Sequence, residues 1–103
     1  MMPTVQDVCR HVRSKNAGPF WVTFDLFFRN REDFHRYARH PALGPATFER
    51  LFGTDPALVK QFPVKNLNMV KISCVRPAPS GGREERDMHS GQMFVRLLGV
   101  ELD

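Results

Sequence analysis

The 103-residue sequence has no long apolar run, and each apolar segment is far shorter than the roughly 20 residues that a membrane-spanning helix requires. The first residues, MMPTVQDVCR, also lack the apolar stretch of a secretion signal. We therefore expect a cytoplasmic protein that makes no membrane contact. With 42% hydrophobic and 25% charged residues, the composition is that of a globular chain rather than a disordered one.

Cysteine is scarce and histidine is scattered. Cys9 and Cys74 each lie among apolar neighbours, in DVCRHV and KISCV, which indicates reduced core residues. The four histidines form no HxH or HExxH pair, and no Cys/His spacing fits a metal centre. The phosphate-binding pattern GxxxxGK[ST] is missing too. The sequence thus predicts neither a metal nor a bound cofactor.

The excess of positive charge is small, because 15 Lys and Arg stand against 11 Asp and Glu, a net charge of +4. The basic residues are spread along the chain, and the segment 83–87, REERD, is mixed in sign. This pattern is typical of a solvated surface, and the next interpretation is an anionic small molecule or an acidic partner surface. Nucleic-acid binders of this size usually concentrate their basic residues, so we predict no nucleic-acid binding.

The first segment, TVQDVCRHVRSKNAGP, has the features of a helix with both ends marked. Thr4 can cap this helix, and Asp7 stands at the capping-box position. Four apolar residues follow a helical spacing, and they are Val5, Val8, Cys9 and Val12. Asn16 or Gly18 can adopt the left-handed conformation that ends a helix, and Pro19 prevents its continuation.

The rest of the chain contains two kinds of predicted element. The strands are rich in β-branched and aromatic residues or alternate in polarity, and they cover 20–28, 68–77, a short edge segment around Pro63, and Val100–Leu102. The helices begin at capping or proline residues and end at proline or glycine, and they lie within 30–40 and 44–53. Both faces of 20–28 are partly apolar, so we expect this strand to be central.

This order of elements, with helices clustered between strands that are joined by short turns, predicts an α+β fold. Its sheet would be mostly antiparallel, with three or so helices on one side. No repeat and no linker divides the chain, so we expect a single domain over residues 1–103.

The octamer RSKNAGPF, residues 13–20, is the first candidate site. As an anion clamp, Arg13 would offer a planar fork of donors, Lys15 a second charge, and Asn16 with the Ala17–Gly18 corner further donors. The alternative is structural, namely a helix end where basic residues favour the helix dipole and the glycine and proline turn the chain. The residues alone leave both interpretations open.

Two later stretches and one acid are further candidates. The segment RPAPSGG, 76–82, is either a binding loop or a solvated linker. In DMHSGQ, 87–92, His89 is either a proton carrier at neutral pH or a structural hydrogen bonder. Its conceivable serine partners are Ser14, Ser80 and Ser90. Asp25 would orient a histidine or an arginine, and the alternative is a single solvent-facing acid.

Three blocks of the sequence resemble a small bacterial family, and they are VRSKNAGPFWVTFDLFF, VKISCVRPAPSGG and DMHSGQMFVRLLGVEL. The chain is similar to domain-of-unknown-function family 4387, whose pattern runs R-S-K-N-A-G-P-F, T-x-D-x-x-F, a strand ending in R-P-x-P-S-G, and a Gly-Gln loop before L-L-x-[VL]-E-[IL]. The positions that match this pattern are Arg13, Ser14, Lys15, Asn16, Gly18, Thr23, Asp25, Arg76, Ser80, Gly81 and Gln92. Residues 89–92, HSGQ, depart from the run Tyr-Gly-Ala-Gln expected there.

The resemblance implies a small partner of the acyclic terpene utilisation protein AtuA, and hence a subunit of a heteromeric lyase or hydratase acting on an organic acid or an acyl-CoA. In this hypothesis the carboxylate or acyl-CoA would contact Arg13, Ser14, Lys15, Asn16, Gly18, Arg76, Ser80, Gly81 and Gln92. His89 and Asp25 would be the catalytic residues. The alternative is a non-catalytic interaction or stabilising module without a ligand of its own, and self-association into a homo-oligomer is compatible with either.

Overall fold

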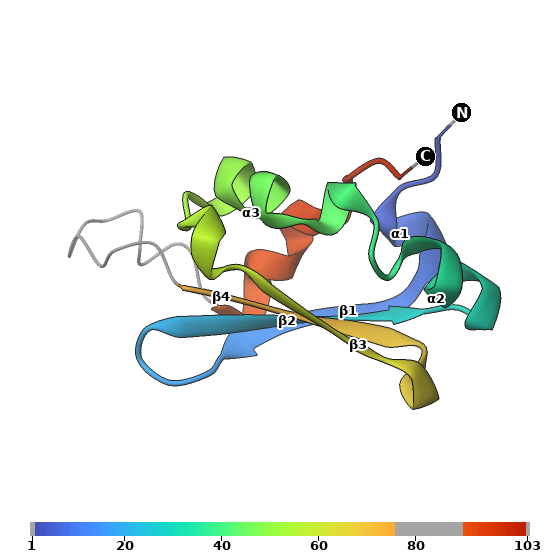
Figure 1. The fold of residues 1–103 in the computed structure, drawn as a ribbon, viewed down its shortest axis with the longest axis horizontal. Coiled ribbons are helices and arrows are strands. Elements are labelled where there is room, and N and C mark those ends of the chain that lie inside the picture. Colours follow the sequence, from blue (N-terminus) through green and yellow to red (C-terminus); the bar gives the residue numbers. More distant parts are fainter. Residues whose placement is uncertain (1, 76–89, 103) are drawn as a thin grey trace.

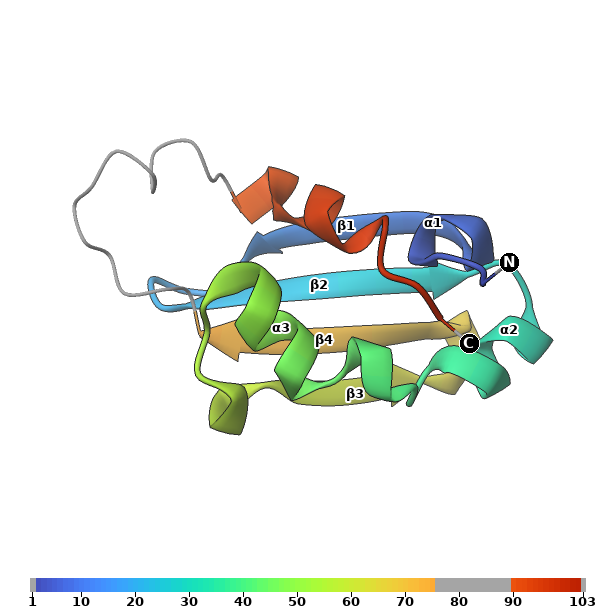
Figure 2. The ribbon, with the colours of Figure 1, turned by 90° about the horizontal axis from the view of Figure 1, so that it is seen from above.

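The computed structural model describes residues 2–75 and 90–102, which form one layer of helices over one sheet (Figure 1). The strands are β1 (Cys9–Asn16), β2 (Trp21–Phe28), β3 (Lys60–Val64) and β4 (Met69–Val75). The helices are α1 (Val5–Val8), α2 (Arg31–Tyr37) and α3 (Pro45–Phe52), with 3-10 segments η1 (Pro41–Leu43), η2 (Pro56–Leu58), η3 (Lys65–Leu67) and η4 (Ser90–Leu97). Figure 2 shows α3 and η4 lying over the strands. The predicted α+β fold is confirmed.

Strand β2 occupies the middle of the sheet. The strand order is β1-β2-β4-β3, and every neighbouring pair is antiparallel. Six of the eight residues of β2 are buried, which confirms the central position predicted from its apolar faces. The strand that contains Pro63 lies at an edge, where a residue without a backbone N–H is tolerated.

Residues 9–16 form strand β1, so the prediction of one helix over this whole segment is wrong. Only α1 is helical, and Thr4 and Asp7 form its capping box as expected. Beyond Val8 the chain pairs with β2, and Val12 and Ser14 are buried while their neighbours are exposed. The spacing of the apolar residues fits a helix, but pairing with β2 buries Val12 equally well and supplies partners for the backbone of the segment.

A four-residue loop, 17–20, joins β1 to β2. The backbone N–H of Ala17 donates to the carbonyl oxygen of Trp21 at 2.9 Å, and Gly18 has a φ of +87°. The Asn-Ala-Gly-Pro signal therefore does turn the chain, but it closes a β-hairpin and not a helix.

The C-terminal residues return to the N-terminus. Thr4 and Glu101 form a single antiparallel bridge. Two backbone hydrogen bonds flank the bridge, from Val5 N to Val100 O at 2.9 Å and from Leu102 N to Pro3 O at 2.7 Å. The strand expected at Val100–Leu102 is thus reduced to one bridge, because the segment that it pairs with enters α1 directly after Thr4.

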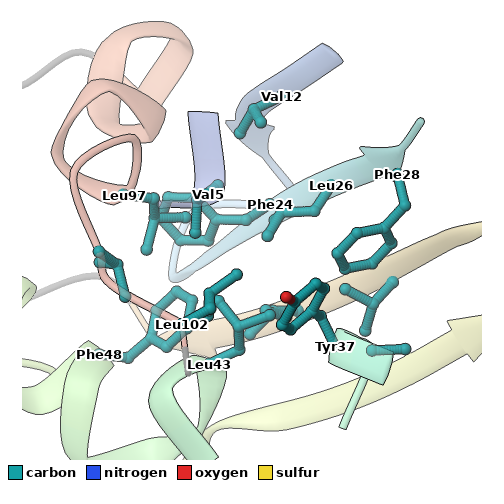
Figure 3. Packing of buried hydrophobic residues seen from close by; sticks show 14 of the residues in the cluster. Val5, Val12, Phe24, Leu26, Phe28, Tyr37, Leu43, Phe48, Leu97 and Leu102 are labelled. Carbon is teal, nitrogen blue, oxygen red and sulfur yellow. The ribbon is translucent and has the colours of Figure 1, made fainter. Parts of the chain in front are cut away.

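The core lies between the helical layer and one face of the sheet (Figure 3). Phe24 is fully buried there, with its ring centroid 5.2 Å from that of Phe48 and 5.0 Å from that of Phe52. Val5 from α1 and Leu97 from η4 have no exposed surface. The helices therefore bury their apolar residues against the same face of the sheet.

Replacing Gly18 with alanine is expected to lower the free energy of unfolding by about 1 kcal/mol, because the left-handed φ is unfavourable for a residue with a Cβ atom. Crowding does not contribute, since no atom lies within 4 Å of the position that this Cβ would occupy. Urea denaturation measures the change. Gly99→Ala is the matched control, because Gly99 is equally uncrowded and has no left-handed φ. Its stability should stay constant or rise slightly, and equal losses in both variants would contradict the left-handed turn.

Candidate functional site

The candidate site lies on the face of the sheet that points away from the helices (Figure 1). Directly opposed residues of antiparallel strands share a face. One cross-strand row on this face is Arg13, Asp25, Lys71 and Phe62, and the adjacent row is Lys15, Thr23, Ser73 and Lys60. We call this surface the open face, and it comprises these two rows together with Arg10, His11, Trp21, Phe27 and Val75.

The open face carries all the charged residues of the sheet. The four strands contain five of the 15 Lys and Arg but only one of the 11 Asp and Glu. Their net charge of +4 equals that of the chain, so the remaining ten basic and ten acidic residues balance. The basic residues are scattered in sequence, but the register of the strands gathers these five on one surface.

Asp25 is the single acid of the open face and is only 1% exposed. The Nε of Arg13 donates to its Oδ2 at 2.8 Å, and the Nζ of Lys71 lies 3.8 Å from its Oδ1. Because a buried carboxylate requires charged partners, these two cations make the burial possible. The alternative of a solvent-facing acid does not hold. Asp25 is held between cations, so it positions Arg13 rather than serving as an exposed base.

The guanidinium of Arg13 also contacts an aromatic ring. Its Cζ lies 5.3 Å from the ring centroid of Phe27, and the Cζ of Arg10 lies at the same distance from that ring. His11 stands beside it, with 5.7 Å between ring centroids. Cation–π contacts of this kind restrain the exposed arginines close to the sheet.

The second row of the open face has two hydroxyl groups between two lysines. Thr23 is 8% exposed, and its buried Oγ1 has no hydrogen-bond partner among the described residues. Ser73 is half-buried, whereas Lys15 and Lys60 are exposed. A buried hydroxyl without a partner is uncommon in folded proteins and is a feature that calls for a physical explanation.

The octamer 13–20 is divided between the two faces of the sheet. Arg13 and Lys15 lie on the open face, whereas Ser14 and Asn16 occupy the alternate positions of β1. The Oγ of Ser14 accepts a hydrogen bond from the backbone N–H of Phe94 at 3.0 Å, which ties β1 to η4. A single clamp built from all four polar side chains is therefore not formed, because successive side chains of a strand point to opposite faces of the sheet.

Several predicted site residues cannot be placed on this surface. Arg76, Ser80, Gly81 and His89 lie outside the described residues, and so do the serine–histidine pairs that involve His89. The backbone of Gln92 belongs to η4, while its side chain is not among those described. Gly18 is at the hairpin turn, where it shapes the backbone.

The sequence prediction missed Lys60, Lys71 and Ser73 as members of the site. The alternation in MVKISCV does place Lys71 and Ser73 on the face of β4 that points away from Val70, Ile72 and Cys74. However, only the pairing with β2 shows that they stand beside Asp25 and Thr23.

The remaining titratable groups do not form a second centre in the described ranges. Within residues 2–75 and 90–102, no group of three His, Cys, Asp or Glu side chains could hold a metal ion. None of the helices in these ranges is long and apolar enough to cross a membrane. Burial raises the pKa of the Cys9 thiol to about 12, with a further contribution from Asp33, and burial raises the pKa of Cys74 to about 11.

A double-mutant cycle with Arg13→Met and Asp25→Asn should give a coupling of about 1–2 kcal/mol in unfolding free energy, because Asp25 is buried. The Arg13 side chain is 52% exposed, and solvent screening keeps the value below that of a fully buried pair. Arg29→Met with Asp33→Asn is the matched control, since this pair has a similar 2.9 Å contact but its carboxylate is 16% exposed, against 1% for Asp25. Its coupling should stay below about 0.5 kcal/mol, and equal couplings would contradict the special position of Asp25.

Both thiols are expected to react slowly with a disulfide reagent at pH 8 while the chain is folded. The rise from an ordinary pKa of 9.0 to about 12 lowers the thiolate fraction of Cys9 roughly a thousandfold, and the rise to about 11 lowers that of Cys74 roughly a hundredfold. The same thiols should react rapidly in urea. Between pH 9 and 11 the two thiols ionise mainly in the unfolded chain, so the free energy of unfolding should fall as the pH rises through this range. Fast labelling of Cys9 in folded Cys74→Ala protein would show that its thiol is not held neutral.

Residues 5–101 match the family model described as a domain of unknown function (DUF4387), and the chain belongs to this family. Neither a curated protein nor a solved structure was found to match the chain. The match confirms the family suggested by the three sequence blocks.

Proposed function

We propose that this DUF4387 chain is the small subunit of a heteromeric enzyme and that its open face docks on a larger protein. The observation that carries the proposal is the one-sided sheet. One face is covered by the helices, while the strand residues of the other face have a net charge of +4 and include several incompletely buried aromatic residues. Positive charge and exposed aromatic surface on the same face are typical of a protein interface, because the charge attracts a partner and the aromatic residues are buried by it.

The apolar part of the open face supports burial by a partner. Phe62 is 49% exposed, and Trp21, Phe27 and Val75 are partly exposed. Aromatic residues and arginine are enriched in the buried centres of protein interfaces. Phe62 and Arg13 occupy the same cross-strand row, so an apolar anchor and a restrained cation are presented together.

The charge of the open face favours a different protein over a second copy of the chain. Two open faces in contact would oppose five basic residues with five, and only the two buried Asp25 side chains would offset them. Pairing of two β1 edges would likewise oppose Arg10, Arg13 and Lys15 with the same residues. An acidic, partly apolar partner surface matches the open face and would increase the rate of association.

The sequence resemblance supplies the candidate for the partner, an AtuA-like large subunit. In this proposal the large subunit performs a lyase or hydratase reaction on an organic acid or acyl-CoA, and the cations of the open face border its site. Asp25 is already engaged by Arg13 and Lys71, so the chemical step is assigned to the large subunit. The second candidate function is a purely stabilising module. The concentration of cations on the open face favours the enzyme subunit over this module.

Co-expression of the tagged chain with an AtuA-like large protein, followed by native mass spectrometry, tests the docking. The wild-type chain should form a complex that weakens as ionic strength rises. Arg10→Glu and Phe62→Ala should each weaken the complex by roughly tenfold or more, because the first introduces a like charge and the second removes an apolar anchor.

Arg50→Glu is the charge-matched control, since Arg50 is an exposed residue of α3 in the helical layer. It should leave the affinity unchanged. The docking proposal fails if the chain remains alone or only self-associates, or if Arg50→Glu weakens the complex as much as Arg10→Glu does. Binding of the chain to single-stranded nucleic acid in place of the protein would equally overturn it. Loss of turnover without loss of the complex in Arg13→Met would separate an enzyme subunit from a stabilising module.

A further inference from the structure

The row Lys15, Thr23, Ser73 and Lys60 crosses all four strands of the sheet. Two hydroxyl groups occupy its middle, and an ammonium group stands at each end. The outer strands are three strand spacings apart, about 14 Å at roughly 4.8 Å each. Lysine carries its charge on a flexible four-carbon stem, so both ammonium groups can turn inwards over the hydroxyls.

The charge of this row is not balanced by the described residues around it. The one acid of the sheet, Asp25, lies in the neighbouring row, where Arg13 at 2.8 Å and Lys71 at 3.8 Å already hold its carboxylate. Lys15 and Lys60 form no ion pair with the described residues. The two rows together have four cations and one anion, which leaves a surplus of positive charge beside the hydroxyl groups.

The hydroxyl of Thr23 is the observation that points to a ligand. Its Oγ1 is buried and has no hydrogen-bond partner within residues 2–75 and 90–102, although a hydroxyl normally donates to an acceptor when it is removed from water. Thr23 shares its face with Lys15 and Ser73, so an acceptor that approached from the open face would meet this hydroxyl between them. The lysines at the two ends of the row, Lys15 and Lys60, are exposed and free to approach an acceptor placed over the hydroxyls.

We infer that this row binds one compact oxyanion, a phosphate or a carboxylate group. The hydroxyl groups of Thr23 and Ser73 donate hydrogen bonds to the oxyanion, while Lys15 and Lys60 neutralise its charge. Asp25 is not assigned to the site, since its carboxylate would repel an anion and is already paired with Arg13 and Lys71. The oxyanion belongs either to a small molecule or to an acidic side chain of a docked protein, and the inference for the small molecule does not rest on docking.

The first experiment is a titration of the ¹⁵N-labelled chain with inorganic phosphate, and separately with acetate, at constant ionic strength. Saturable amide shifts confined to Lys15, Thr23, Ser73 and Lys60 are expected. Thr23→Val preserves the side-chain shape but removes the donor, so the affinity should fall roughly tenfold, as expected for a hydrogen bond to a charged group. Lys15→Gln should weaken binding several-fold, whereas Lys65→Gln, in η3 outside the row, should have no effect.

The second experiment distinguishes the source of the oxyanion and uses the complex with the large protein. If free anions do not bind, but Thr23→Val weakens the complex while Arg50→Glu does not, the oxyanion is an acidic side chain of the partner. Non-saturable shifts spread over the lysines of the chain, together with an unchanged complex for Thr23→Val, would overturn the site. That result would leave docking through Arg10 and Phe62 intact, so the two proposals fail separately.

Discussion

The pairing of β2 with β1 on one side and β4 on the other sets which residues enter the core and which reach the open face. Strand side chains alternate, so this pairing sends Phe24 and Leu26 into the core and Thr23 and Asp25 to the open face. A shift of one residue would reverse both sets and place a carboxylate among the phenylalanines. The register that builds the core therefore also builds the candidate site.

Asp25 shows how a costly residue is accommodated at this position. The carboxylate of Asp25 in the middle strand is removed from water. The flanking strands place two cations, Arg13 and Lys71, directly opposite it. The ion pair with Arg13 is further restrained by the ring of Phe27. Such an arrangement organises a surface at some expense of stability, and it accounts for why the arginine is fixed although half of its side chain is exposed. The adjacent row lacks an acid, which gives it a different chemistry.

The one-sided sheet connects these local features to the proposed function. A layer of helices covers one face of the sheet. The other face has partly exposed aromatic residues beside basic residues. The membership in the DUF4387 family agrees with the sequence pattern and assigns no activity. The distribution of charge and apolar surface therefore supports a docking subunit, and a buried hydroxyl that has no acceptor in the described part of the chain supports an oxyanion site.

Elements with local sequence signals are predictable from the amino-acid sequence alone. Asn30 caps α2, Pro45 and Gly53 bound α3, and the two-faced apolar pattern of β2 predicts a central strand. The antiparallel α+β class follows from the order of such elements. The apolar spacing of residues 9–16 predicts a helix, and only hydrogen bonding to β2 selects strand β1. The site likewise depends on strand pairing, because Arg13, Asp25 and Lys71 are far apart in sequence and only the register of the strands brings them together.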